Sequence, residues 1–105
     1  SYSLVGPHAQ QALEGLTADK LFLGVDGLDP DVGITTPDPL EAELNALMLR
    51  VARETIAVAD ASKLGRRSLS VIAPAPALHR LVTDGGADPG KAAALRAQGV
   101  EVIIV

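Results

Sequence analysis

The feature that most constrains the fold is an apolar run at residues 21–25, which gives way abruptly to glycines, carboxylates and two threonines. An apolar run without polar alternation is typical of a strand buried on both faces, as in the parallel sheets of α/β proteins. In such sheets the ligand crevice lies beyond the carboxyl ends of the strands. Asp26, Asp29, Thr35 and Thr36, which follow the run, are therefore candidates for a binding pocket.

Four apolar segments alternate with helix signals along the chain, which is the pattern of an α/β fold. The expected strands are centred near residues 20–25, 55–60, 80–84 and 100–105. Asp38 with Pro39, and Asp88 with Pro89, are typical of a helix cap followed by the first helical residue. Successive strand–helix–strand steps join parallel strands through right-handed crossovers. We therefore predict a parallel sheet with flanking helices.

The helices and one irregular stretch carry further expectations. A first helix is predicted over residues 7–16, and a second begins at Pro39 and runs for about four turns. The expected buried stripes are Ala9, Ala12, Leu13 and Leu16 on the first helix, and Leu40, Leu44, Leu47, Met48 and Val51 on the second. Between residues 68 and 79, Pro74 and Pro76 limit any helix to about one turn, so we predict a packed loop.

Length and composition limit the size of the domain and the kinds of partner that the chain can have. A chain of 105 residues is at most one small domain, and with 48% hydrophobic but only 2% aromatic residues its core must be built from Ala, Val, Leu and Ile. The net charge of -4 argues against direct binding to nucleic acid. There is no cysteine and no apolar run near the roughly 20 residues of a membrane span. We predict one domain over residues 1–105 that is cytoplasmic and does not contact membranes.

The candidate ligand residues follow the first two strands. Asp26 and Asp29 lie on either side of Gly27, close enough in sequence to accept hydrogen bonds from one polyol, and the glycine allows a ligand to approach the backbone. The alternative is a simple turn followed by a solvated loop. Thr35 and Thr36 could donate to a phosphate or hydroxyl, or could cap the next helix.

Lys63 follows the second strand near the start of a helical turn, where free backbone N–H groups and a cation together could anchor a phosphate. The alternative is ordinary solvated basic surface. The two histidines, His8 and His79, have no spaced ligand partners, so no metal site is predicted. Gly85-Gly86 belongs to neither phosphate-binding glycine motif, and no cofactor is predicted.

Over nearly its whole length the chain resembles the sugar-sensing C-terminal domain of DeoR-type bacterial transcriptional regulators. The matching stretches are residues 4–7, 18–27, 33–37, 59–67, 83–84 and 99–105. The resemblance implies the fold shared by ribose-5-phosphate isomerase and glucosamine-6-phosphate deaminase, and a phosphorylated sugar as effector. It also implies regulation, usually repression, of genes of carbohydrate metabolism. DNA would be bound only through an N-terminal winged helix-turn-helix that these residues lack, so the chain is expected to be the C-terminal part of the sensor.

Two functions from different classes remain open: an effector-sensing domain, and a sugar-phosphate isomerase, deaminase or lactonase of the same fold. Residues 24–28 look like the G-x-D-G-H motif of the deaminases, but Leu28 stands where their histidine transfers a proton. Since leucine cannot do so, we predict that the chain is not an enzyme. The isomerases of this fold use paired aspartates, however, and Asp26 and Asp29 keep that spacing.

The predicted sheet has a consequence for assembly. Without the upstream strands that the resemblance implies, an apolar edge or face of the sheet would be left uncovered, and such patches favour association. We therefore predict a homo-oligomer.

Overall fold

The computed structural model describes residue 11 and residues 15–105. The predicted helix over residues 7–16 lies almost entirely outside the described residues. Of its expected buried stripe only Leu16 is described, and this side chain is exposed.

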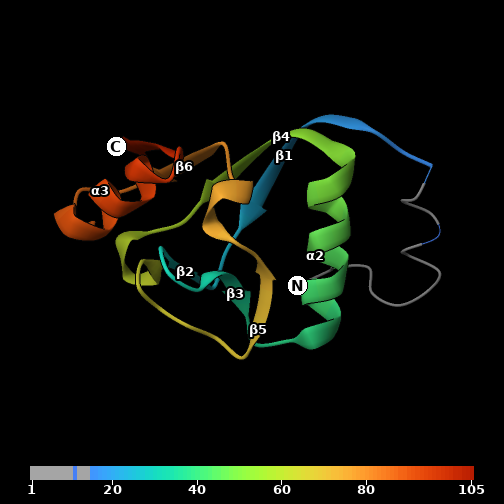
Figure 1. The fold of residues 1–105 in the computed structure, drawn as a ribbon, viewed down its shortest axis with the longest axis horizontal. Helices are drawn as coiled ribbons and strands as arrows, with labels where there is room; N and C mark the ends of the chain where they lie inside the picture. Colours follow the sequence, from blue (N-terminus) through green and yellow to red (C-terminus); the bar gives the residue numbers. More distant parts are fainter. Residues whose placement is uncertain (1–10, 12–14) are drawn as a thin grey trace.

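The main sheet contains four strands, β1 (Ala18–Gly24), β4 (Ala52–Val58), β6 (Arg80–Thr83) and β7 (Glu101–Ile104). They pair in the order β1-β4-β6-β7, and every pairing is parallel. Figure 1 shows β1 next to β4, with helices α2 (Pro39–Val51) and α3 (Pro89–Ala97) toward opposite ends of the molecule. The order along the sheet is thus the order along the chain. The predicted parallel sheet is confirmed.

A second, smaller sheet was not predicted. It pairs β2 (Gly27–Asp29), β3 (Gly33–Thr36) and β5 (Ser70–Ala73) antiparallel in the order β2-β3-β5. The predicted loop over residues 68–79 is therefore wrong at β5, whereas the 3-10 helix η2 (Ala75–Ala77) keeps within the single turn expected from Pro74 and Pro76. These strands have three or four residues each, too few for a periodic pattern, and they form through pairing between segments far apart in the sequence.

Two helices begin at the predicted caps. α2 (Pro39–Val51) starts where the Asp38 carboxylate accepts from Leu40 N–H, and α3 (Pro89–Ala97) starts where Asp88 accepts from Lys91 N–H. The buried face of α2 differs from the prediction: Leu44 and Leu47 are buried together with Ala42, whereas Met48 and Val51 are half-buried. Leu40 is exposed, because it lies in the first turn, where no described element covers it.

The core lies on one face of the parallel sheet. Leu23, Ala57, Leu81 and Val102 point into it and pack in one cluster with side chains from all three connections, among them Ala42, Leu64, Ile72, Leu78 and Leu95. The other face is exposed at Phe22, Val58 and Ile103. The expectation that residues 21–25 are buried on both faces is therefore wrong, since Phe22 lies on the face opposite to Leu23 and is 66% exposed.

Candidate functional site

A cavity of about 610 Å³ opens at the carboxyl ends of β1 and β4, next to α2. Its polar lining comes from six side chains: Asp26 after β1, Thr36 at the end of β3, Glu41 and Asn45 of α2, Asp60 after β4, and Lys63 in η1 (Ala61–Lys63). Thr35 also contributes to the wall, and Leu23, Met48, Val58 and Ile72 supply apolar surface. The cavity lies where parallel α/β sheets bind ligands.

Asp26 and Thr36 are joined directly across the cavity wall. The Thr36 hydroxyl donates to Asp26 Oδ2 at 3.1 Å, which ties the end of β1 to the end of β3. Asp26 is exposed, and its Oδ1 has no hydrogen-bond partner among residues 15–105. This oxygen is therefore available to accept from a ligand hydroxyl.

Thr35 has a structural contact. It is fully buried, and its Oγ1 accepts from Ser68 N–H at 2.9 Å, which fixes the chain leading into β5. The cap of α2 is the Asp38 side chain, so the helix-capping alternative does not apply to either threonine. Of the two threonines, Thr36 is the one whose hydroxyl donates a hydrogen bond to a carboxylate of the cavity lining.

Lys63 lies in the pocket lining, but the backbone around it differs from the expectation. Ala61 N–H donates to Asp84 Oδ2, Ser62 N–H to Asp60 Oδ1, and Lys63 N–H to the Asp60 carbonyl. The N–H groups of η1 are thus already used, and the prediction of free ones is wrong. Lys63 itself makes no ion pair within the described part of the chain, so it can offer a phosphate only its ammonium.

The Asp60 carboxylate is held ionised beside Lys63. Hydrogen bonds from the Ser62 hydroxyl and N–H lower the pKa of Asp60, and the positive charges of Lys63 and Arg66 lower it further. Asp60 therefore contributes a negative charge to the same side of the cavity as the lysine.

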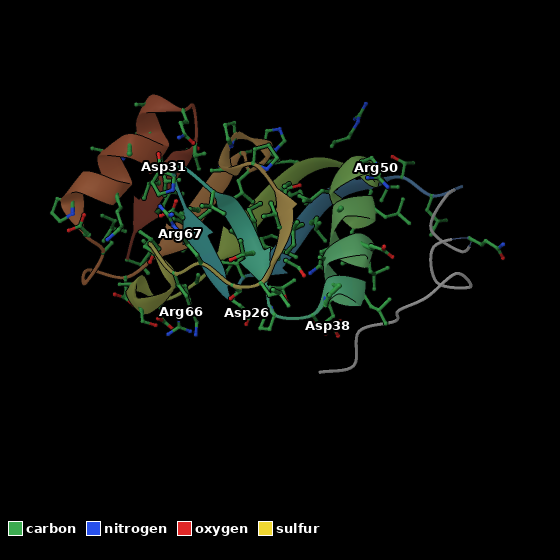
Figure 2. All side chains as sticks on the ribbon, turned by 60° about the horizontal axis from the view of Figure 1, so that its bottom comes forward. Asp26, Asp31, Asp38, Arg50, Arg66 and Arg67 are labelled. Carbon is green, nitrogen blue, oxygen red and sulfur yellow. The ribbon has the colours of Figure 1, made fainter. Side chains whose placement is uncertain are left out.

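Asp29 lies outside the pocket lining. Its Oδ2 accepts from Asp31 N–H and Val32 N–H, both at 2.9 Å, and is 3.2 Å from Arg67 Nη2. Figure 2 shows Arg67 beside Asp31 and apart from Asp26. Burial would raise the pKa of Asp29, but the two N–H donors and the Arg67 guanidinium outweigh it and hold the pKa below its ordinary value. The expectation that Asp26 and Asp29 share one pocket is therefore wrong.

Gly27 and Leu28 are packing residues. A Cβ at Gly27 would lie 2.4 Å from the Arg66 carbonyl oxygen and 2.5 Å from Thr35 Oγ1, so the glycine is required for strand packing, and it does not line the cavity. Leu28 is fully buried in the core. The backbone turns its side chain away from the pocket.

The sequence-based selection missed three polar lining residues, Glu41, Asn45 and Asp60. Glu41 and Asn45 are four residues apart on α2 and therefore share a face, and Met48 continues that stripe. Asp60 follows the end of β4 at the same distance along the chain as Asp26 follows the end of β1. Both could have been predicted from the sequence: Glu41 and Asn45 from their helical spacing, and Asp60 from its position after a strand.

Other kinds of site are not found in the part of the chain that the structure describes. No group of three or more His, Asp or Glu residues there could hold a metal ion. None of the helices in the same part is long and apolar enough to cross a membrane.

Comparison with known proteins finds one family model and several transcriptional regulators that resemble this chain. The family model of the DeoR C terminal sensor domain matches residues 1–85. The chain is 40% identical over 101 residues to the HTH-type transcriptional regulator GlpR of Haloferax volcanii, covering 96% of this chain and 40% of that protein. It is also 40% identical over 105 residues to a putative aga operon transcriptional repressor of Escherichia coli O157:H7, covering 100% of this chain and 39% of the repressor.

A third relative, the uncharacterized HTH-type transcriptional regulator YulB of Bacillus subtilis, is 37% identical over 105 residues, which are 41% of its length. The chain therefore spans about two-fifths of the length of these relatives. All three are named as transcriptional regulators or repressors, not as enzymes. The match of the family model over most of the chain, together with these identities, shows that the chain belongs to the DeoR family, in the region of its C-terminal sensor domain.

Proposed function

We propose that this chain is the effector-sensing part of a DeoR-type transcriptional regulator of carbohydrate metabolism, and that its effector is a phosphorylated sugar. The observation that carries the proposal is the cavity at the carboxyl ends of β1 and β4, which combines carboxylates, an amide, a hydroxyl and one ammonium. Residues 1–105 would be the C-terminal part of the sensor, and the protein would act in the cytoplasm.

The charges of the lining suggest how such a ligand would lie. Asp26 would accept from sugar hydroxyls through its free Oδ1, and Asn45 could both donate to and accept from the same hydroxyls. The only cation in the described lining is Lys63. A phosphate would therefore be placed against Lys63, whose ammonium would also offset the neighbouring Asp60 carboxylate, and away from Asp26, with the hydroxyl groups of the sugar directed toward β1.

The names of the relatives support regulation over catalysis. They include an HTH-type regulator and an operon repressor, and each is about two and a half times as long as the match. A net charge of -4 makes this chain a poor ligand for DNA, so DNA contacts would come from a helix-turn-helix elsewhere in the regulator. The buried Leu28 supports the same reading, because the position equivalent to the deaminase histidine faces the core and not the cavity.

Calorimetry with defined sugars tests the proposal. Ribose 5-phosphate, glucosamine 6-phosphate and fructose 6-phosphate, each beside its unphosphorylated sugar, would be titrated into the 105-residue chain and into a polypeptide of the relatives' length that carries it. We expect at least one phosphorylated sugar to bind and its unphosphorylated form to bind more weakly. Equal affinity for both forms, or no binding by any of the three to the longer polypeptide, would contradict it.

Lys63→Ala tests the phosphate contact. A charge-assisted hydrogen bond contributes about 1.5–3 kcal/mol, so the dissociation constant should rise by roughly 10-fold to 150-fold. Lys91→Ala is the matched control, since Lys91 lies on α3 outside the cavity lining. An unchanged affinity in Lys63→Ala would remove this residue from the site.

Incubation with the same three phosphosugars distinguishes sensing from catalysis. We expect binding without conversion. Turnover by the wild-type protein that disappears in Asp26→Asn would favour the isomerase, deaminase or lactonase alternative instead.

A further inference from the structure

The short helix η1 carries Lys63 into the cavity lining, but its own hydrogen bonds do little to fix its orientation. Lys63 N–H donates to the Asp60 carbonyl, and Leu64 N–H donates to the Ala61 carbonyl. A 3-10 helix of three residues has few such bonds, so its orientation depends on contacts with neighbouring segments. The Lys63 ammonium can meet a ligand phosphate only if η1 keeps its place beside the cavity.

One hydrogen bond ties η1 to a distant part of the chain. Ala61 N–H donates to Asp84 Oδ2 at 3.1 Å, across 23 positions of sequence. Within the described part of the chain, no other hydrogen bond joins residues 60–63 to a segment outside residues 60–66. Asp84 is not part of the cavity lining. Any effect of Asp84 on a ligand would therefore pass through η1.

The turn that carries Asp84 is itself held in place. Asp84 follows β6, its Oδ1 accepts from Gly86 N–H at 2.9 Å, and its carbonyl accepts from Ala87 N–H at 3.2 Å. Ala87 is buried in the core cluster. A Cβ at Gly86 would lie 3.3 Å from the Ala61 Cβ, so the turn lies directly against η1. The two oxygens of one carboxylate thus join a fixed turn to the helix that carries the pocket lysine.

We propose that Asp84 is a positioning residue of the effector site, whose carboxylate holds η1 in the orientation that presents Lys63 to the ligand phosphate. This inference rests on the proposed function, because it takes Lys63 as the phosphate contact. Since Asp84 itself does not touch the ligand, its replacement should remove only the part of the affinity that Lys63 provides. A general loss of stability would not distinguish phosphorylated from unphosphorylated sugars.

A double-variant cycle in calorimetry tests this dependence in a polypeptide of the relatives' length, with ribose 5-phosphate, glucosamine 6-phosphate and fructose 6-phosphate as probes. Asp84→Ala should raise the dissociation constant at least about fivefold, but by no more than the roughly 10-fold to 150-fold expected for Lys63→Ala. The double variant should bind within about twofold of Lys63→Ala alone, because a misplaced lysine contributes no more than an absent one.

Two further variants separate positioning from stability. Asp88→Ala removes a carboxylate that accepts from Lys91 N–H at 2.9 Å and caps α3 outside the cavity lining. It should lower the urea midpoint and leave the dissociation constant within about twofold. Asp84→Asn keeps one acceptor oxygen of the two, so it can serve Gly86 N–H or Ala61 N–H but not both, and it should recover part of the affinity lost in Asp84→Ala.

Amide hydrogen exchange, followed by NMR on the 105-residue chain, tests the same contact without a ligand. In Asp84→Ala the amides of Ala61 and Lys63 should exchange at least about tenfold faster, because η1 opens locally. Ala57, fully buried in β4, is the internal reference for global unfolding and should change less. The Lys63 amide is the decisive one, since it donates to the Asp60 carbonyl and loses no partner of its own in the variant.

Three results would overturn the proposal: effects of Asp84→Ala and Lys63→Ala that add in the double variant, an equal loss of affinity for the phosphorylated and unphosphorylated sugars, or a Lys63 amide that accelerates no more than that of Ala57. Failure of all three phosphosugars to bind the wild-type polypeptide would instead contradict the proposed function. Selective acceleration at Lys63 would then still support the role of Asp84 in holding η1.

Discussion

Replacing Asp29 by alanine tests whether this carboxylate stabilises the fold, as its contacts indicate. Asp29 is 5% exposed, and its Oδ2 accepts from the N–H groups of Asp31 and Val32 while facing Arg67 at 3.2 Å. Alanine removes the acceptor and leaves two N–H donors and a guanidinium without it. We expect Asp29→Ala to lower the free energy of unfolding substantially whether or not a ligand is present.

The magnitude follows from these contacts. Hydrogen bonds to a charged group contribute about 1.5–3 kcal/mol each, and the lower end applies because water can reach the exposed turn residue Asp31. The ion pair adds no more than about 0.5 kcal/mol, since the Arg67 side chain is 56% exposed. The expected loss is therefore about 3 kcal/mol. Asp31→Ala is the control: its side chain is 87% exposed and 3.8 Å from Arg67, so the loss should stay within about 0.5 kcal/mol.

Urea unfolding followed by far-ultraviolet circular dichroism measures both losses. With a slope of about 1–1.5 kcal/mol per molar urea, Asp29→Ala should lower the midpoint by roughly 2–3 M at neutral pH. A loss below about 1 kcal/mol, or one equal to that of Asp31→Ala, would refute the structural role of Asp29.

The same variants give a pH dependence with a definite sign. The pKa of Asp29 is lower in the folded chain than in the unfolded one, so its contribution is fully present above the unfolded value. It is lost as the pH falls through the folded value. The difference between wild type and Asp29→Ala should therefore be constant from pH 7 to about 5 and shrink below about pH 4. A difference that grows in acid would contradict the assigned cause.

Three further substitutions, one of them with a matched control, test the packing behind the site and the contact between Thr36 and Asp26. Gly27→Ala should cost more than about 2 kcal/mol in urea unfolding, since its Cβ would meet backbone, whereas Gly24→Ala, with nothing within 4 Å, should cost less than about 0.5 kcal/mol. Leu28→His should destabilise the chain by at least about 2 kcal/mol and produce no phosphosugar turnover, because it buries an imidazole in the core; measurable turnover would contradict this placement. Thr36→Val should change the unfolding free energy by about 1 kcal/mol and alter effector affinity in calorimetry, since it removes the hydroxyl that holds Asp26; a shift in neither quantity would exclude that link.

Much of the framework was predictable because the signals are local. The apolar segments near residues 20–25, 55–60, 80–84 and 100–105 became β1, β4, β6 and β7, with the parallel pairing expected from intervening helices. Asp38 and Asp88 cap the helices that follow them. A cap and a proline act within one turn of chain, so adjacent residues are sufficient to specify them. The placement of Asp26 and Lys63 in one cavity follows from the same rule for strand ends.

The burial of each face could not be predicted from the same patterns. The apolar run at residues 21–25 predicts a strand covered on both sides, but whether a second layer covers Phe22 depends on what packs there. Likewise, the strands of the small sheet have three or four residues, and β3 pairs with β5 across more than thirty residues of sequence. Such pairing is set by contacts between distant segments, not by local propensity.

For the site, the sequence by itself determined which polar residues follow the strands, and with them the region of the pocket. Only the tertiary structure decided which of those residues face it. Asp26 and Asp29 are three positions apart and chemically equivalent, yet one lines the cavity and the other is bound to Asp31, Val32 and Arg67. The physical reason is that a carboxylate is directed by the donors within hydrogen-bond reach, and the Arg67 donor is brought to Asp29 from a distant part of the chain by folding.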